Sequence, residues 1–134
     1  MPEIVDFVRR GAATISPAMV EKLLRHLPQW KLEFTQIHEP LFPHLGEQLE
    51  FLADAVEDTV EGAYKDLPFI ALAQASFALI YAHKKVGIIP DSVLSLGRAD
   101  DSSVVRAVLI QNEKAFAAYA TSRNRDWAQI TSQP

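Results

Sequence analysis

Hydrophobic residues recur every three or four positions along most of this chain, the spacing that places them on one face of an α-helix. No segment keeps the alternation of hydrophobic and polar residues that is typical of a strand. The pattern therefore predicts an all-α, single-domain helical bundle of about five helices with short connections, covering residues 1–130, with a frayed tail at 131–134. The helices are predicted near residues 17–27, 29–37, 47–63, 67–82 and 102–121, with a shorter helical run at 4–10.

Prolines, glycines and capping residues divide the predicted helices. Gly11 follows the first run and is predicted to end it in the left-handed conformation. Ser16 and Pro17 predict the start of a helix, because a serine oxygen caps it and a proline at its first position needs no N–H. Pro28 either kinks this helix or begins a new one. The prolines and glycine of residues 38–46 predict a reversal of the chain.

The segment at 67–82 is hydrophobic on almost every side, with Gln74 and Ser76 as its polar interruptions. A helix of this kind is buried in a protein core or in lipid. The run is shorter than the roughly 20 residues that cross a bilayer, and His83 and two lysines close it. We expect a central bundle helix that does not span a membrane, and a membrane-proximal position stays open.

The helix at 47–63 is predicted to carry an acidic outer face, made of Glu50, Asp54, Glu57, Asp58 and Glu61. Such a face is either solvated or docks a basic partner, since a surface of one charge steers association. Several of these carboxylates lie four residues apart, where like charges repel by a few tenths of a kcal/mol. We expect Lys65 or a partner to compensate part of this repulsion.

The corner at residues 88–101 combines helix breakers with three aspartates. Helix capping explains it: Asp91 begins a short helix, Gly97 ends it, and Asp100 or Asp101 caps the next helix. The alternative is an oxygen-rich site for Mg²⁺ or Ca²⁺, if Gly97 allows Asp91, Asp100 and Asp101 to converge. The spacing is not that of a calcium-binding loop, which favours the capping interpretation.

The corner resembles the signature of the YkvA-like family of bacterial domains of unknown function, Y-x-x-S-P-x-D-x-I-P-D-x-I-P-x-x-G-x-x-D-D. Every gap length is kept, and the identical positions are Tyr81, Ile89, Pro90, Asp91, Gly97, Asp100 and Asp101. The chain departs from the signature at the Ser-Pro pair, the first aspartate and the second proline, where it has Lys84-Lys85, Gly87 and Leu94. With the flanking helices the resemblance covers about residues 67–120, and it implies a helical fold without an activity to carry over.

A second possible ligand set lies around the predicted reversal and consists of His38, Glu39, His44 and Glu47. Histidine and glutamate are ligands for zinc or iron. Their spacing is not that of the H-E-x-x-H motif, so surface polar residues around a turn are the competing interpretation.

Composition narrows the possible functions of this chain of 134 residues. Its formal net charge of −4 argues against nucleic-acid binding, which depends on clustered lysine and arginine. The absence of cysteine excludes disulfides, thiolate nucleophiles and cysteine-bound zinc. The N-terminal residues lack the basic and apolar regions of a secretory signal, so we expect a cytoplasmic protein.

No nucleophile, base and orienting group stand in a recognisable catalytic motif. We therefore expect a non-enzymatic domain that acts through protein–protein contact or self-association. The alternative is a protein that binds a divalent metal or a small ligand through the corner aspartates.

Overall fold

The computed structural model describes residues 2–85 and 94–130, and these residues form seven α-helices. The prediction of an all-α bundle is confirmed, although it expected about five helices. The helices are α1 (Pro2–Ala13), α2 (Pro17–Leu24), α3 (Leu27–Phe34), α4 (Leu45–Val60), α5 (Phe69–Lys85), α6 (Leu94–Gln111) and α7 (Glu113–Ser122).

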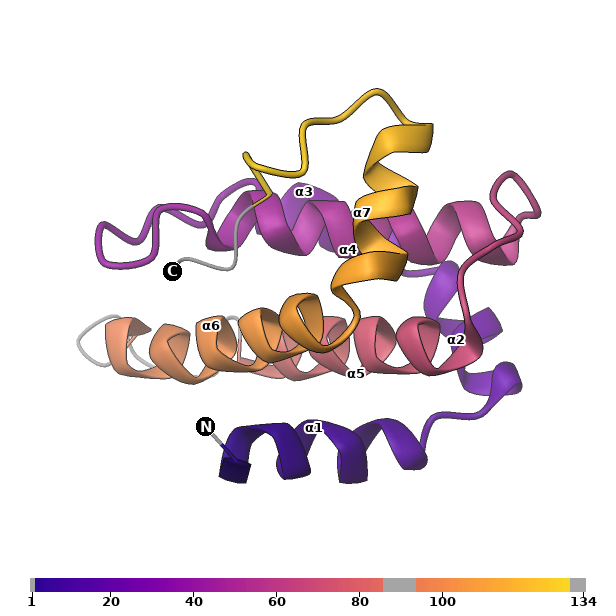
Figure 1. The fold of residues 1–134 in the computed structure, drawn as a ribbon. Coiled ribbons are helices and arrows are strands. Elements are labelled where there is room, and N and C mark those ends of the chain that lie inside the picture. The colour runs from indigo at the N-terminus through magenta and orange to yellow at the C-terminus, as the bar shows by residue number, and fades with distance from the viewer. Residues whose placement is uncertain (1, 86–93, 131–134) are drawn as a thin grey trace.

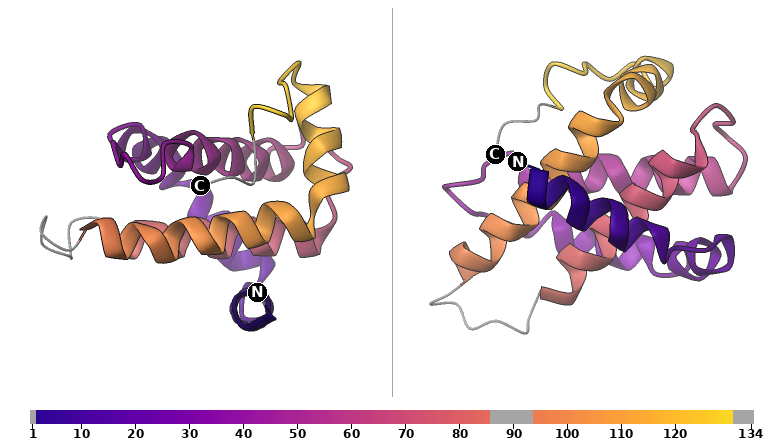
Figure 2. Two further views of the ribbon diagram at one scale, coloured as in Figure 1. Left: turned by 60° about the vertical axis from the view of Figure 1, so that its left-hand side comes forward. Right: turned by 60° about the horizontal axis from the view of Figure 1, so that its bottom comes forward.

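The helices stack in layers around an antiparallel pair formed by α5 and α6 (Figure 1). Helix α1 lies on one side of this pair and α4 on the other, as the two turned views in Figure 2 also show. Helix α3 packs on α4, and α7 stands across the end of α6. Since α5 contacts α1, α4 and α6, it is the central helix predicted from its hydrophobic sequence.

The core is built mainly from α4, α5 and α6. Alanine and leucine side chains from successive turns of α5 are fully buried, as are Phe51 of α4 and Phe116 of α7. Trp127 is half-buried, with its ring centroid 5.9 Å from that of Phe51, and Ile130 is buried. The residues after α7 thus dock on the bundle, and the predicted frayed tail at 131–134 lies outside the described residues.

Two breaks in the helices explain why the structure has more helices than predicted. The chain begins a new helix, α3, at Leu27, so Pro28 occupies its first turn and does not kink α2. The long helix predicted at 102–121 is divided at Asn112, which separates α6 from α7. The Nδ2 of Asn112 donates to the carbonyl oxygen of Val108 at 2.9 Å and to Oε1 of Gln74 at 2.8 Å. Asn112 thereby fastens this break to α5.

The local signals at three other helix ends had mixed outcomes. The Oγ of Ser16 accepts from the backbone N–H of Met19, which confirms the predicted cap of α2. Gly62 follows α4 with a φ of +84°, the left-handed conformation that ends a helix. The prediction for Gly11 was wrong, because α1 continues through it to Ala13. Gly11 instead allows close packing, since a methyl group there would lie 2.2 Å from Cε1 of Phe77.

Candidate functional site

The described corner aspartates lie inside a helix. Asp100 and Asp101 belong to α6, which begins at Leu94, so the prediction that they cap its start was wrong. Asp100 is exposed, whereas Asp101 is fully buried. Successive residues are separated by about 100° around a helix, which explains why the two side chains meet different surroundings. Asp91 lies outside the described residues, so the proposed convergence of the three aspartates stays a prediction.

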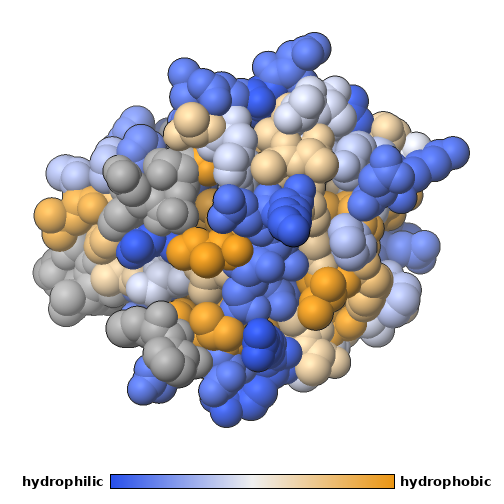
Figure 3. Space-filling model, in the orientation of Figure 1, coloured by the Kyte–Doolittle hydropathy of each residue, from blue (hydrophilic) through white to orange (hydrophobic). Residues whose placement is uncertain are grey.

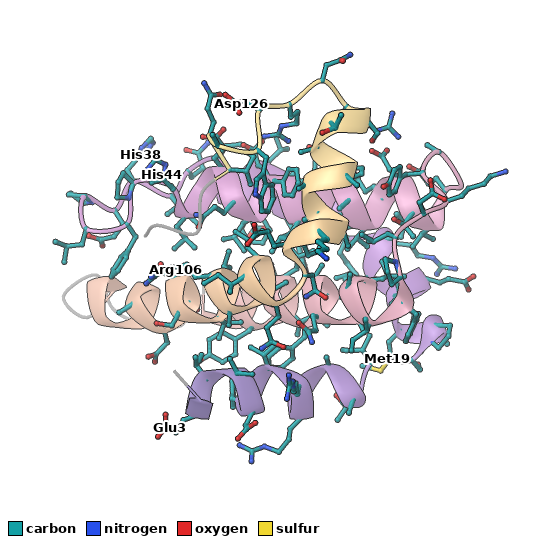
Figure 4. All side chains as sticks on the ribbon, in the orientation of Figure 1. Glu3, Met19, His38, His44, Arg106 and Asp126 are labelled. Atoms are coloured by element: carbon teal, nitrogen blue, oxygen red, sulfur yellow. The ribbon has the colours of Figure 1, made fainter. Side chains whose placement is uncertain are left out.

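The second predicted ligand set does not form a metal site. His38 and His44 lie on the connection between α3 and α4 (Figure 4). Glu39 accepts from the backbone N–H of Leu41 at 3.3 Å, and Glu47 lies 3.9 Å from Nη2 of Arg125. Within residues 2–85 and 94–130, no group of three or more histidines and carboxylates is arranged to hold a metal ion. These four residues therefore belong to the turn and to the surface of the bundle.

The acidic face of α4 is largely neutralised within the chain. Lys31 of α3 places its Nζ 2.8 Å from Oδ1 of Asp54 and 2.7 Å from Oε1 of Glu57. Arg125, after α7, lies 3.3 Å from Oδ2 of Asp54. Burial opposes the charge of Lys31, but its hydrogen bonds and the negative charges of both carboxylates outweigh this effect and raise its pKa. Asp54 and Glu57 are thus not available as an acidic surface for a basic partner.

Asp58 has a separate set of partners. The Tyr119 hydroxyl donates to its Oδ2 at 2.5 Å, and Nε of Arg123 lies 3.0 Å from the same oxygen. Burial raises the pKa of Tyr119, and the hydrogen bond to Asp58 raises it further.

The contribution predicted for Lys65 is not seen among the described ion pairs. Its place is taken by Lys31, Arg123 and Arg125, which come from segments distant in sequence.

A stack of aromatic rings and imidazoles links α3 to the end of α5. The His83 ring lies 3.9 Å from the Trp30 ring, centroid to centroid, and is nearly parallel to it. Nε2 of His83 lies 3.4 Å from Oε1 of Glu33, and the His26 ring lies 5.9 Å from Trp30. Sequence spacing could not predict this group, because its members belong to different helices. Its arrangement ties α3 to α5 and contains a carboxylate–imidazole pair.

The most distinctive feature of the described surface is a pair of neighbouring grooves along one flank of α1. The α1–α6 groove has a volume of about 210 Å³, and its apolar lining comes from Ile4, Val5, Ala107 and Ile110. The α1–α5 groove has a volume of about 390 Å³, and its apolar lining comes from Ala12, Ala13, Ile15, Phe69, Ile70 and Ala73. Arg9 of α1 donates from Nε to Oε1 of Gln111 at 3.3 Å, and these residues line one groove each.

Three large hydrophobic residues line these grooves and remain open to solvent. Phe69 is 48% exposed, Ile70 61% and Ile110 54%; we call these three residues the apolar flank. On the face shown in Figure 3, hydrophobic patches are separated by hydrophilic side chains. The apolar flank was not predicted from the sequence. The signal was present in α5, which is hydrophobic on more sides than its neighbouring helices cover.

Comparison of the chain with family models, curated proteins and solved structures gave no match. The resemblance to the YkvA-like family therefore stays a prediction, and the case for a function depends on the described surface.

Proposed function

We propose that this chain is a non-enzymatic helical-bundle domain of the YkvA-like kind that acts in the cytoplasm by association, first of all with a second copy of itself. The observation that supports this function is the apolar flank. Phe69, Ile70 and Ile110 are about half exposed or more and line two neighbouring grooves. Exposed hydrophobic residues that gather in this way are typical of interaction surfaces.

Two other features of the described residues support association through the apolar flank. The acidic face of α4 has its ion-pair partners within the chain, so it is a weaker candidate for docking. In the part of the chain that the structure describes, no helix is both long and apolar enough to cross a membrane. A membrane-proximal position would therefore involve contact of the same apolar flank with a lipid surface.

Sedimentation tests the proposal with a matched pair of variants. The double variant Ile70→Ser/Ile110→Ser removes two residues of the apolar flank. The control Leu32→Ser/Leu41→Ser removes two equally large side chains, 64% and 68% exposed, that line neither groove. We expect the wild-type protein and the control to form dimers as concentration rises, and the flank variant to stay monomeric.

A wild-type protein that is monomeric at every concentration would contradict self-association. Recovery of the wild-type chain with floated lipid vesicles, lost in the flank variant, would assign the surface to lipid instead. Equal loss of dimer in the flank variant and in the control would show that the apolar flank has no special role.

The alternative function is binding of Mg²⁺ or Ca²⁺ through Asp91, Asp100 and Asp101. Its support is the set of three carboxylates in one corner of the sequence, since oxygen ligands are those that Mg²⁺ and Ca²⁺ prefer. Calorimetric titration with each ion tests it. Heat of binding that disappears in Asp101→Asn would support the metal site, and the absence of heat together with an unchanged melting temperature would reject it.

A further inference from the structure

The α1–α5 groove has the lining of a site for a hydrophobic molecule. It lies between the end of α1 and the start of α5 and is lined mostly by alanine and larger hydrophobic side chains. Its volume of about 390 Å³ falls in the range of small-molecule pockets, which are mainly apolar with a few polar groups. The groove therefore suits an apolar molecule that carries a small number of polar atoms.

One cation lies at this groove. Arg9 lines it, and Nε of Arg9 donates to Oε1 of Gln111, which holds the guanidinium in place. No interaction of the two terminal nitrogens of Arg9 is seen among the described residues. Arginine is well suited to carboxylates, because its planar nitrogens form two parallel hydrogen bonds with them.

The polar residues that line the groove favour an anionic ligand over a cationic one. Among the described residues that line the groove, none is acidic. Gln74 is the other polar lining residue; it is buried, and its Oε1 already accepts from Asn112 at 2.8 Å. The groove therefore offers a positive charge beside hydrophobic walls, although the chain as a whole has a net charge of −4.

We propose that the α1–α5 groove binds a straight-chain fatty acid, with the carboxylate on Arg9 and the acyl chain along Phe69 and Ile70. This site goes beyond the proposed association. It shares Phe69 and Ile70 with the apolar flank, but Arg9→Gln tests it separately, because that substitution leaves all three residues of the flank in place.

Decanoate below its micellar concentration is the probe, titrated into the full-length chain and followed by amide chemical shifts. We expect saturable shifts at residues 12–15 and 69–73. Arg9→Gln should weaken binding by about tenfold, the effect of losing about 1.4 kcal/mol of binding free energy. Arg10→Gln is the matched control, since it removes the same charge from the next residue of α1, which does not line the groove. It should keep the wild-type affinity.

A second pair of variants tests the apolar part of the site. Ala13→Phe fills the groove and should abolish the shifts, whereas Ala118→Phe, at an exposed position of α7, should not. Equal weakening by Arg9→Gln and Arg10→Gln, or equal affinity for decanoate and 1-decanol, would overturn the carboxylate contact. Shifts that appear only with anionic vesicles and never with free decanoate would overturn the fatty-acid site.

Discussion

Lys31 donates a hydrogen bond from Nζ to Oδ1 of Asp54 across 2.8 Å, which joins α3 to α4. The same nitrogen lies 2.7 Å from Oε1 of Glu57, so one cation serves two carboxylates on successive turns of α4. Both carboxylates are half-buried, so water competes less well with Lys31 for their oxygens. This contact converts the acidic face of α4 from a source of repulsion into a contact between helices.

Replacing Lys31 tests how much this contact stabilises the fold. We expect Lys31→Met to lower the free energy of unfolding by about 1–2 kcal/mol, because two charge-assisted hydrogen bonds are lost at a partly exposed site. Urea denaturation measures the change. Lys65→Met is the control, since Lys65 is exposed, and it should change stability by no more than about 0.5 kcal/mol. Equal losses in both variants would contradict a specific role for Lys31.

Tyr119 should make stability depend on pH in the alkaline range. Burial and the hydrogen bond to Asp58 raise its pKa above the ordinary value of 10.0. The folded state therefore favours the protonated hydroxyl, and this contribution is complete below pH 10.0 and declines as pH rises above it. As pH rises above about 10, the wild-type protein should lose more stability than Tyr119→Phe. Denaturation at several pH values measures the difference.

Tyr64→Phe is the control for the cost at neutral pH only, because burial and the charge of Asp66 raise the pKa of Tyr64 as well. The Tyr64 ring packs against Tyr119 with a centroid distance of 5.1 Å, so the substitution keeps the ring contact. At neutral pH, Tyr119→Phe should cost about 1–2 kcal/mol through loss of the hydrogen bond to Asp58. Tyr64→Phe should cost less. An alkaline loss of stability that is the same in the wild-type protein and in Tyr119→Phe would refute the assignment.

Gly11 should be needed for packing of α1 against α5. In an exposed helix, alanine is more stabilising than glycine by about 1 kcal/mol. At position 11, however, the methyl group of alanine would overlap the Phe77 ring. That ring is held by Phe7 and Tyr81, at centroid distances of 5.6 and 6.1 Å. We expect Gly11→Ala to lower the melting temperature in the wild-type background and to raise it in a Phe77→Leu background. A rise in both backgrounds would show that Phe77 moves aside.

Asp101 and its neighbour Asp100 should differ in their effect on stability. Asp101 is fully buried in α6 and has an interaction partner, so Asp101→Ala should cost about 1–3 kcal/mol. Asp100 also has an interaction, but it is exposed, so Asp100→Ala should cost less than about 1 kcal/mol. Chemical denaturation of the two single variants measures this difference. Similar costs would contradict the different surroundings of the two side chains.

Local sequence signals predicted helices well and helix boundaries less well. The Ser16 cap and the left-handed Gly62 depend on neighbouring residues alone, and the structure has both. The role of Gly11 and the break at Asn112 were not predicted, because each is explained by a contact with α5. Gly11 lies against Phe77, and Asn112 is fastened to Gln74. A single-sequence pattern contains no information on such contacts between distant segments.

The sequence by itself determined the helical class and favoured a central place for α5, since hydrophobic spacing predicts helices and the hydrophobicity of residues 69–82 is typical of a buried helix. Only the tertiary structure decided which charges meet and which hydrophobic residues stay exposed. Lys31 precedes Asp54 in the sequence and Arg125 follows it, yet both reach its carboxylate, and α1 leaves Phe69, Ile70 and Ile110 uncovered. The reason is physical: burial and ion pairing depend on how helices pack, and the spacing within one helix does not specify its neighbours.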